Sequence, residues 1–243
     1  MSKSFDFKYQ ASSIVLVGDL DPLEFTPKVL DISQIVSHED ILQSNVKAAG
    51  IDVLVTSYPW FELSVTPIAQ NQNKLVLSLT DYGYKSQFLD LIVSLLHLCS
   101  PTTLSALGIN FTKHIQHKTS EDWHDTGHML VPSKKWTQAF DKKGKQCHVG
   151  VRNLSMKIET VLASVSGYDV KFEPELNIDI RPTNRDHNRN PVSNYTELTF
   201  NYHFPLTNEE STSIDMAQDT IKHYYNVLND ELTDSIEQLL NNA

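Results

Sequence analysis

Four of the ten histidines in this 243-residue chain fall within residues 114–128, at His114, His117, His124 and His128. Imidazoles four residues apart on a helix share a face and can bind Zn²⁺ or a similar ion, which predicts a metal site at His124 and His128. Asp125 follows His124, where helical zinc proteases carry a glutamate. On a strand, His114 and His117 would point to opposite faces. The pattern allows a metal-dependent hydrolase or nuclease; the alternative, which we favour, is a polar loop with exposed histidines.

Arginine is clustered in a second segment. Three of the four arginines are Arg181, Arg185 and Arg189, and His187 lies between the last two. Guanidinium groups bind phosphate or carboxylate through paired hydrogen bonds, so the cluster predicts a site for an anion or an acidic partner. Nearby acids could neutralise the arginines instead, namely Asp179, Asp186 and Glu197. The segment is long for a loop between two strands, which favours a functional or a mobile segment.

Charge is distributed unevenly along the chain. Residues 113–157 carry nine Lys/Arg against four Asp/Glu, and residues 201–243 carry one against eight. Lys134 and Lys135 adjoin Trp136, and lysines beside aromatic rings can bind single-stranded nucleic acid. The net charge of −10 and the pI near 5.4 disfavour nucleic acid as the partner. We therefore expect an amphipathic helix with Trp136 and Phe140 on its inner face, and a basic surface for a protein partner.

Several protein classes lack support in the sequence. It has no GxGxxG, P-loop, nucleophile elbow or Cys/His zinc spacing. The two cysteines, Cys99 and Cys147, suit a reducing compartment. No secretory signal pattern is visible, and the most apolar stretch, residues 88–98, is far shorter than the ~20 residues of a membrane span. We expect a cytoplasmic protein that is not inserted in a membrane.

The periodicity of apolar residues predicts an α+β fold. Alternating residues predict hairpin strands at 62–67 and 75–79 and a strand at 107–112, with a buried helix over 85–98 between them. A second hairpin is predicted at 176–180 and 198–203, with an extra strand near 148–163. Residues 13–19 read as a strand and 38–49 as a helix. The order predicts two pseudo-repeated β-β-α halves with an antiparallel sheet, at 1–116 and 148–243, joined by a basic segment at 117–147 or forming one continuous domain.

The acidic C-terminal part predicts a long helix over residues 211–241. Thr207 and Glu210 resemble a capping box, and apolar residues recur about every 3.6 positions from Ile214 to Leu239. At ~1.5 Å per residue such a helix is ~45 Å long, enough to reach past a domain of this size. We expect its apolar face to form a subunit interface, with these central residues: Ile221, Tyr225, Leu228 and Leu232.

The stretch Leu107-Gly-Ile-Asn-Phe-Thr-Lys-His-Ile115 follows a hairpin and a buried helix, and a second hairpin and an acidic helix come later. This layout resembles an uncharacterised bacterial family of similar length, whose members have a Gly-Leu-Arg-Tyr-like strand at this place. Asn110 stands where that family usually has Arg. Its members occur sporadically, as mobile or defence-associated genes do. The resemblance implies no catalytic residues.

Two functions follow as hypotheses. The first is a non-enzymatic interaction or adaptor subunit of a bacterial cytoplasmic assembly, with a role in defence as one option. It would need no cofactor, and would bind another protein or a second copy through its basic and Arg-rich surfaces. The second is a metal-dependent hydrolase or nuclease using the histidines of residues 114–128, which would need a divalent metal. We favour the first.

Overall fold

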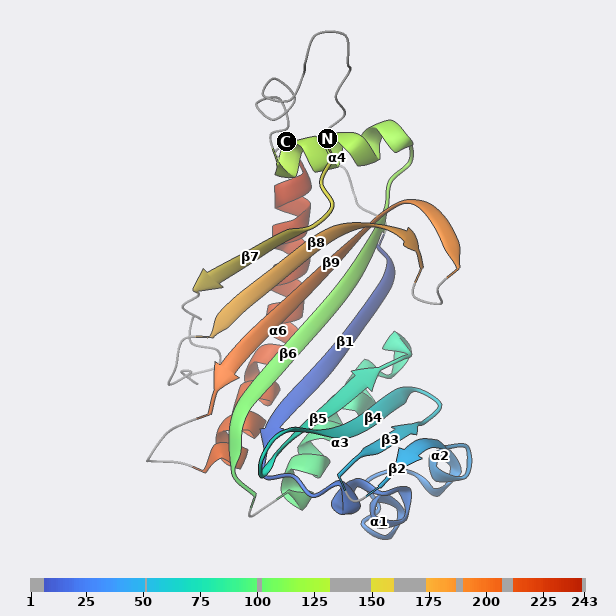
Figure 1. Cartoon of the computed structure of the whole chain (residues 1–243), viewed down its shortest axis with the longest axis vertical. Coiled ribbons are helices and arrows are strands. Elements are labelled where there is room, and N and C mark those ends of the chain that lie inside the picture. Colours follow the sequence, from blue (N-terminus) through green and yellow to red (C-terminus); the bar gives the residue numbers. More distant parts are fainter. Residues whose placement is uncertain are drawn as a thin grey trace.

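The computed structural model describes residues 7–50, 52–99, 102–131, 150–159, 174–186, 190–206 and 212–241. Within these residues, a nine-stranded antiparallel sheet has the order β2-β3-β4-β5-β1-β6-β9-β8-β7 (Figure 1). The strands are β1 (Phe7–Gly18), β2 (Asn45–Ala49), β3 (Leu54–Ser57), β4 (Phe61–Ala69), β5 (Gln72–Leu79), β6 (Leu104–Gln116), β7 (Leu154–Glu159), β8 (Glu175–Arg185) and β9 (Pro191–Pro205).

Two long helices cover one face of this sheet. They are α3 (Lys85–Leu98) and α6 (Ser213–Asn241), which pass behind the sheet in Figure 1. The smaller helices are η1 (Pro22–Phe25), α1 (Pro27–Ile32), α2 (His38–Leu42), η2 (Tyr82–Tyr84) and α4 (Ser120–Leu130). No helix of the described residues combines the length and the apolar character that crossing a bilayer requires.

The core lies between the sheet and α3 and α6. Alternate residues of the central strands are buried and most of them are apolar, as in β1 with Ile14 and Leu16, because successive side chains of a strand point to opposite faces. On β9 the same alternation buries Phe200, Tyr202 and Phe204. The alternation stabilises the fold mainly because it buries these large apolar side chains against the helices, away from water.

The main predictions of the fold are confirmed: an α+β fold, an antiparallel sheet and a long C-terminal helix. The sheet runs across the predicted boundary at residues 117–147, because β6 of the first half pairs with β9 of the second. The pseudo-repeat of the two halves and the domain limits stay predictions. The extra strand near 148–163 is the shorter β7.

The predicted helix over residues 38–49 is wrong in its second part. Helix α2 has its N-cap at Ser37, whose hydroxyl accepts a hydrogen bond from the Asp40 amide, and it ends at Leu42. Residues 45–49 form β2 instead, paired with β3. Gly50 closes the turn after this strand by an N–H···O bond of 2.8 Å to Val53, so the glycine marks a strand end rather than a helix end.

Helix α6 begins later than the sequence pattern predicted. Its cap is Thr212, whose hydroxyl accepts from the Asp215 amide at 3.1 Å and donates to the Asp215 carboxylate at 2.6 Å. Thr207 and Glu210, the predicted capping pair, lie outside the described residues. The spacing Thr-x-x-Asp at 212–215 is itself a capping box, in which the acidic residue also meets the positive end of the helix dipole.

Candidate functional site: the uncovered face of the sheet

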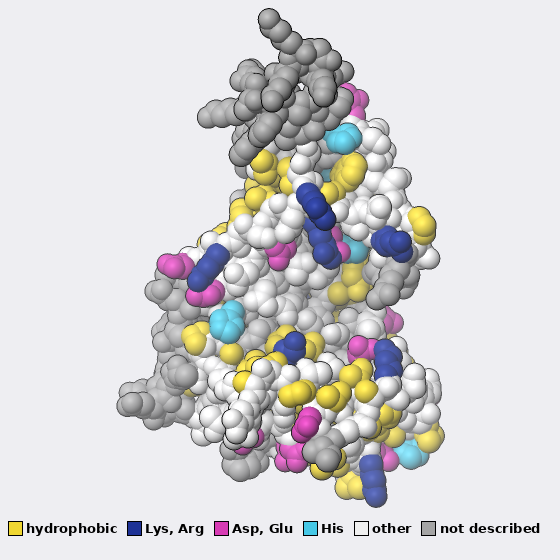
Figure 2. Space-filling view, viewed as in Figure 1, with side chains coloured by type: hydrophobic (Ala, Val, Ile, Leu, Met, Phe, Trp, Pro, Cys, Tyr) yellow, Lys and Arg dark blue, Asp and Glu magenta, His cyan; other side chains and the backbone are white. Residues whose placement is uncertain are grey.

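No described helix packs on the face of the sheet opposite α3 and α6, and we call it the uncovered face. It faces the viewer in Figures 1 and 2. Its side chains alternate with the core residues, and most are half-buried or exposed. Figure 2 shows that the face is dominated by uncharged polar groups and backbone, with scattered charged side chains of both signs and small hydrophobic patches.

A row of polar residues crosses the whole width of this face. In the register of the strands, one residue from each strand lies beside the next, and none of them is hydrophobic. We call this set the polar row: Asn45, Ser57, Glu62, Ser78, Ser13, Asn110, Asn201, Asn177 and Lys157.

Hydrogen bonds connect several neighbours in the polar row. The Asn110 side-chain amide donates to the Ser13 hydroxyl at 3.1 Å, and the Asn201 amide donates to the Asn110 side-chain oxygen. The Ser57 hydroxyl donates to the Glu62 carboxylate at 2.7 Å. Such cross-strand pairs fix the polar groups in a regular array. The row is thus a pre-ordered surface of donors and acceptors.

Four residues of another row on the same face, two rows away from the polar row, form a denser group, which we call the His114 cluster: Tyr9, His114, Glu197 and Arg181. The Glu197 carboxylate lies 3.1 Å from His114 Nε2 and accepts hydrogen bonds from the Arg181 guanidinium at 2.5–2.8 Å. The Tyr9 ring packs over His114 with the ring centroids 5.1 Å apart. His114 itself is only 3% exposed.

Electrostatics of the His114 cluster keep Glu197 ionised. The hydrogen bond from His114 and the charge of Arg181 lower the pKa of the Glu197 carboxyl, although burial opposes them. An ionised carboxylate only accepts hydrogen bonds, so His114 Nε2 carries the proton of this contact. His114 Nδ1 is buried and has no hydrogen-bond partner among the described residues. The cluster can orient a polar group, but it contains no pair of a nucleophile and a base.

The predicted anion site is only partly within the described residues. Arg181 lies on the uncovered face and is paired with Glu197, which was one of the acids expected to neutralise it. Arg185 lies exposed at the end of β8. The remaining predicted residues, Arg189, His187, Lys134 and Lys135, lie outside the described part of the chain, as does most of the basic segment.

The structure separates the four predicted histidines. His114 faces the uncovered side, whereas His117 lies on the helix side, with Nε2 2.9 Å from the Thr196 hydroxyl and Nδ1 3.4 Å from that of Thr126. The expectation of a loop with exposed histidines is wrong for these two, because His114 lies in β6, His117 directly follows the strand, and both are buried. Burial lowers the pKa of His117 and favours its neutral form. The opposite orientation of the two side chains follows from strand alternation, as predicted.

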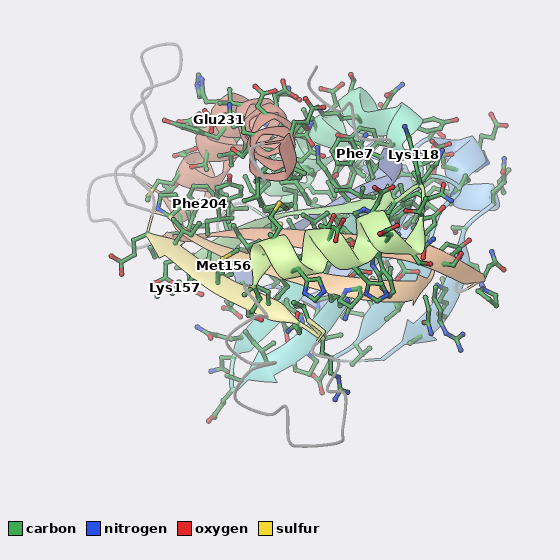
Figure 3. All side chains as sticks on the ribbon, turned by 90° about the horizontal axis from the view of Figure 1, so that it is seen from above. Phe7, Lys118, Met156, Lys157, Phe204 and Glu231 are labelled. Atoms are coloured by element: carbon green, nitrogen blue, oxygen red, sulfur yellow. The ribbon has the colours of Figure 1, made fainter. Side chains whose placement is uncertain are left out.

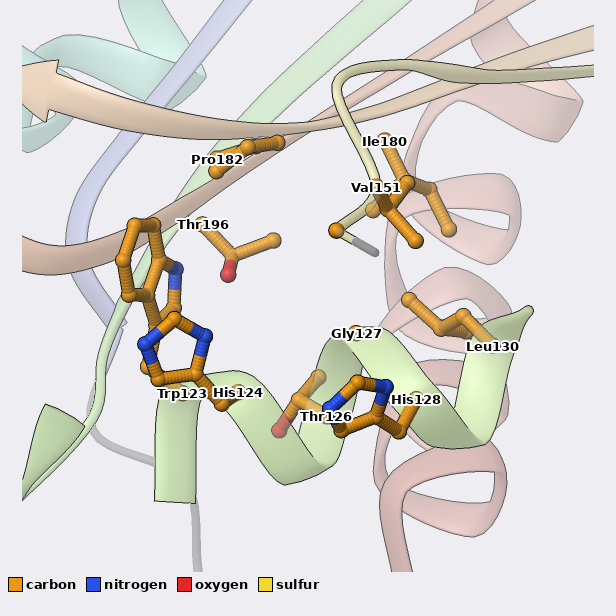
Figure 4. A pocket seen from close by; sticks show the side chains of 11 residues that line it. Trp123, His124, Thr126, Gly127, His128, Leu130, Val151, Ile180, Pro182 and Thr196 are labelled. Carbon is orange, nitrogen blue, oxygen red and sulfur yellow. The ribbon is translucent and has the colours of Figure 1, made fainter. Parts of the chain in front are cut away.

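His124 and His128 line one pocket on the helix side, between α4, Val151 and strands β8 and β9 (Figure 4). The pocket has a volume of about 170 Å³ and a mainly apolar lining, to which Ile180 and Pro182 contribute. α4 is held there by the Trp123 indole N–H, which donates to the Tyr195 carbonyl at 3.1 Å. The described residues contain no group of three potential metal ligands, whereas catalytic zinc sites use three protein ligands.

The residues predicted to form a subunit interface lie in the core of the chain itself. Exposure is 0% for Ile221, Tyr225 and Leu228, and 3% for Leu232. The apolar face of α6 covers the sheet, where the Tyr225 ring packs on Phe111 and its hydroxyl bonds to that of Ser12. An interface between subunits therefore requires another surface.

Sequence reasoning missed both the polar row and the buried Lys113. The apolar positions of β6 are Leu107, Ile109, Phe111 and Ile115, and Lys113 falls in the same alternation. This alternation was the signal in the sequence that could have predicted the burial of Lys113. The polar row had no such signal, since it exists only when the register of nine strands is known.

The sequence matches no protein-family model, and no curated protein matches it. The resemblance to a bacterial family therefore remains a prediction.

Proposed function

We propose that this chain is a non-enzymatic interaction subunit that binds a protein partner on the uncovered face of its sheet. The observation that carries the proposal is the polar row, which spans all nine described strands without an apolar residue. The resemblance noted above adds the setting, a bacterial cytoplasmic assembly with a role in defence.

The size of the uncovered face supports this proposal. At ~4.8 Å between strands, nine strands make a surface about 38 Å wide. The central strands β1, β6 and β9 have 12, 13 and 15 residues, so the face is about as long as it is wide. A specific protein–protein interface needs only about 800 Å² from each partner. The face therefore has room for a stable complex.

The chemistry of the face favours a polar protein surface as the partner. Serine, threonine and asparagine side chains offer both donors and acceptors, which suits an interface rich in hydrogen bonds and bound water. The net charge of −10 disfavours a polyanionic nucleic acid. Arg181 reaches out from the His114 cluster, and an acidic group of the partner would compete with Glu197 for its guanidinium.

Site-specific photo-crosslinking in cells of the native host tests the proposal. A photoreactive residue replaces Thr199, which lies on the uncovered face between Thr112 and Asp179. The matched control replaces Lys222, which is exposed on α6 on the opposite side. We expect a discrete crosslinked protein from position 199 and not from 222. Equal products from both positions, or none from position 199, would overturn the proposal.

A further inference from the structure

The two edges of the sheet differ in how they end. β2, at one edge, carries a register shift between Val46 and Ala48. A bulge in an edge strand is a device that prevents pairing with another strand. β7, at the other edge, pairs regularly with β8 over all six residues and shows no such shift. Its outer backbone edge is unpaired within the described sheet.

β7 also exposes apolar side chains. Met156 is 36% exposed and Ile158 is 42% exposed. Both lie on the helix side of the sheet, where α6 covers the central strands but leaves these two side chains exposed. Figure 3 shows Met156 and Lys157 side by side on this strand. A regular edge strand with exposed apolar residues is a template for another strand.

From these features we infer that β7 pairs with β7 of a second copy, antiparallel about a two-fold axis at Met156. A two-fold contact needs a strand that is complementary to itself. In this register Leu154 lies opposite Ile158 of the second copy, and Met156 lies opposite its own counterpart, so the apolar side chains meet each other. Ser155 lies opposite Lys157 on the other face.

The charges of β7 favour this register over the next possible one, with the axis at Lys157, which would also keep the apolar side chains of both copies on one face. A shift of the axis to Lys157 would place two lysines directly opposite each other, which is destabilising. With the axis at Met156, each Lys157 keeps its own Glu175 at 2.6 Å, and Ser155 keeps its hydrogen bond to Asp179. Pairing therefore breaks no polar contact of the single chain.

The consequence is a sheet that continues through both copies. Antiparallel pairing about an axis perpendicular to the sheet leaves the two uncovered faces on the same side. The surface buried by one pair of short strands is at the lower end for protein contacts, so we expect a dimer with a Kd of roughly 10–100 μM.

Disulfide trapping and sedimentation equilibrium test the inference independently of any partner protein. Met156→Cys is made in a Cys147→Ser background, and the control is Val46→Cys at the other edge, where Val46 is similarly exposed. We expect a covalent dimer from Met156→Cys under mild oxidation, since opposite residues of paired strands are close enough for a disulfide. The control should stay monomeric.

Sedimentation of the protein without new cysteines should show a reversible dimer that Ile158→Lys weakens at least tenfold. A strict monomer at concentrations of about 200 μM, well above the expected Kd, would overturn the inference, as would equal crosslinking at position 46.

Discussion

Lys113 shows at the scale of one residue what this fold tolerates. It lies on the helix side of β6 with 1% exposure, bonded to the Thr233 hydroxyl and with Nζ 5.1 Å from the centroid of the Phe7 ring. Burial lowers its pKa to about 8 from the ordinary value of 10.5, while Asp230 opposes the shift. A buried ammonium without an adjacent carboxylate costs stability, and replacement by an apolar residue of similar size is often favourable.

We therefore expect Lys113→Met to stabilise the protein at pH 7 by about 1–3 kcal/mol. Between pH 8 and 10.5 the unfolded chain binds more protons at Lys113 than the folded chain, so the stability of the natural protein rises with pH in this window. The variant should lose that rise. Urea unfolding from pH 7 to 10 measures both effects, with exposed Lys222→Met as the control. A less stable variant, or an unchanged rise, would contradict this account.

Glu197 has the opposite dependence on pH. The hydrogen bond from His114 and the charge of Arg181 lower its pKa below the ordinary 4.5, so its contribution is present above pH 4.5 and is lost as the pH falls through the folded value. Glu197→Gln should destabilise the protein at pH 7 by about 1–2 kcal/mol.

The difference between this variant and the natural protein should shrink as the pH is lowered below 4.5, in unfolding curves recorded from pH 7 to 3. Asp52→Asn, in an exposed loop, is the control. A difference that does not change with pH would mean that the charge of Glu197 has no stabilising role.

At the scale of elements, strict alternation of apolar residues was sufficient to predict β4 and β5, and helical periodicity was sufficient to predict α3 and α6. They failed for residues 45–49, because Lys47 and the two alanines favour a helix and only Val46 favours a strand, so that pairing with β3 decides their conformation. Arg181 was found as a site residue from composition alone. His114 was a candidate only as a metal ligand, and its grouping with Tyr9 and Arg181 was not predicted, because these residues come together only through the pairing of β1, β6, β9 and β8.

The close packing of the start of β6 against the end of β1 depends on one glycine, Gly18. A Cβ on Gly18 would lie 2.4 Å from the Thr103 carbonyl oxygen and 3.0 Å from Leu104 Cα, both backbone atoms. Gly18→Ala should therefore push the two strands apart and destabilise the protein by about 2–4 kcal/mol. Gly150→Ala is the matched control, since nothing lies within 4 Å of its Cβ position. Thermal unfolding compares the two, and similar Tm values would contradict the close packing at Gly18.

At the scale of the whole molecule, α6 connects the parts that the sequence divides. Its Ser213 hydroxyl accepts from the Leu104 amide, and Asn229 accepts from the Tyr82 hydroxyl at 3.2 Å. Gln218 contacts His97 of α3 at 2.9 Å. The helix belongs to residues 148–243 and thus contacts β6, η2 and α3 of residues 1–116, and β6 pairs with β9 across the same boundary.

This arrangement predicts that residues 1–116 and 148–243 unfold together. Ile221→Ala removes a fully buried side chain from α6 and should cost about 2–5 kcal/mol through the cavity it leaves. Amide hydrogen exchange should then lose protection by the same free energy in β5 and in β9, because one cooperative core has one global unfolding step. Leu77→Ala, in β5, should have the same effect from the other half. If each substitution lowered protection only in its own half, the two halves would be separate folding units, and contacts through α6 and the β6–β9 pair would not be strong enough to couple them.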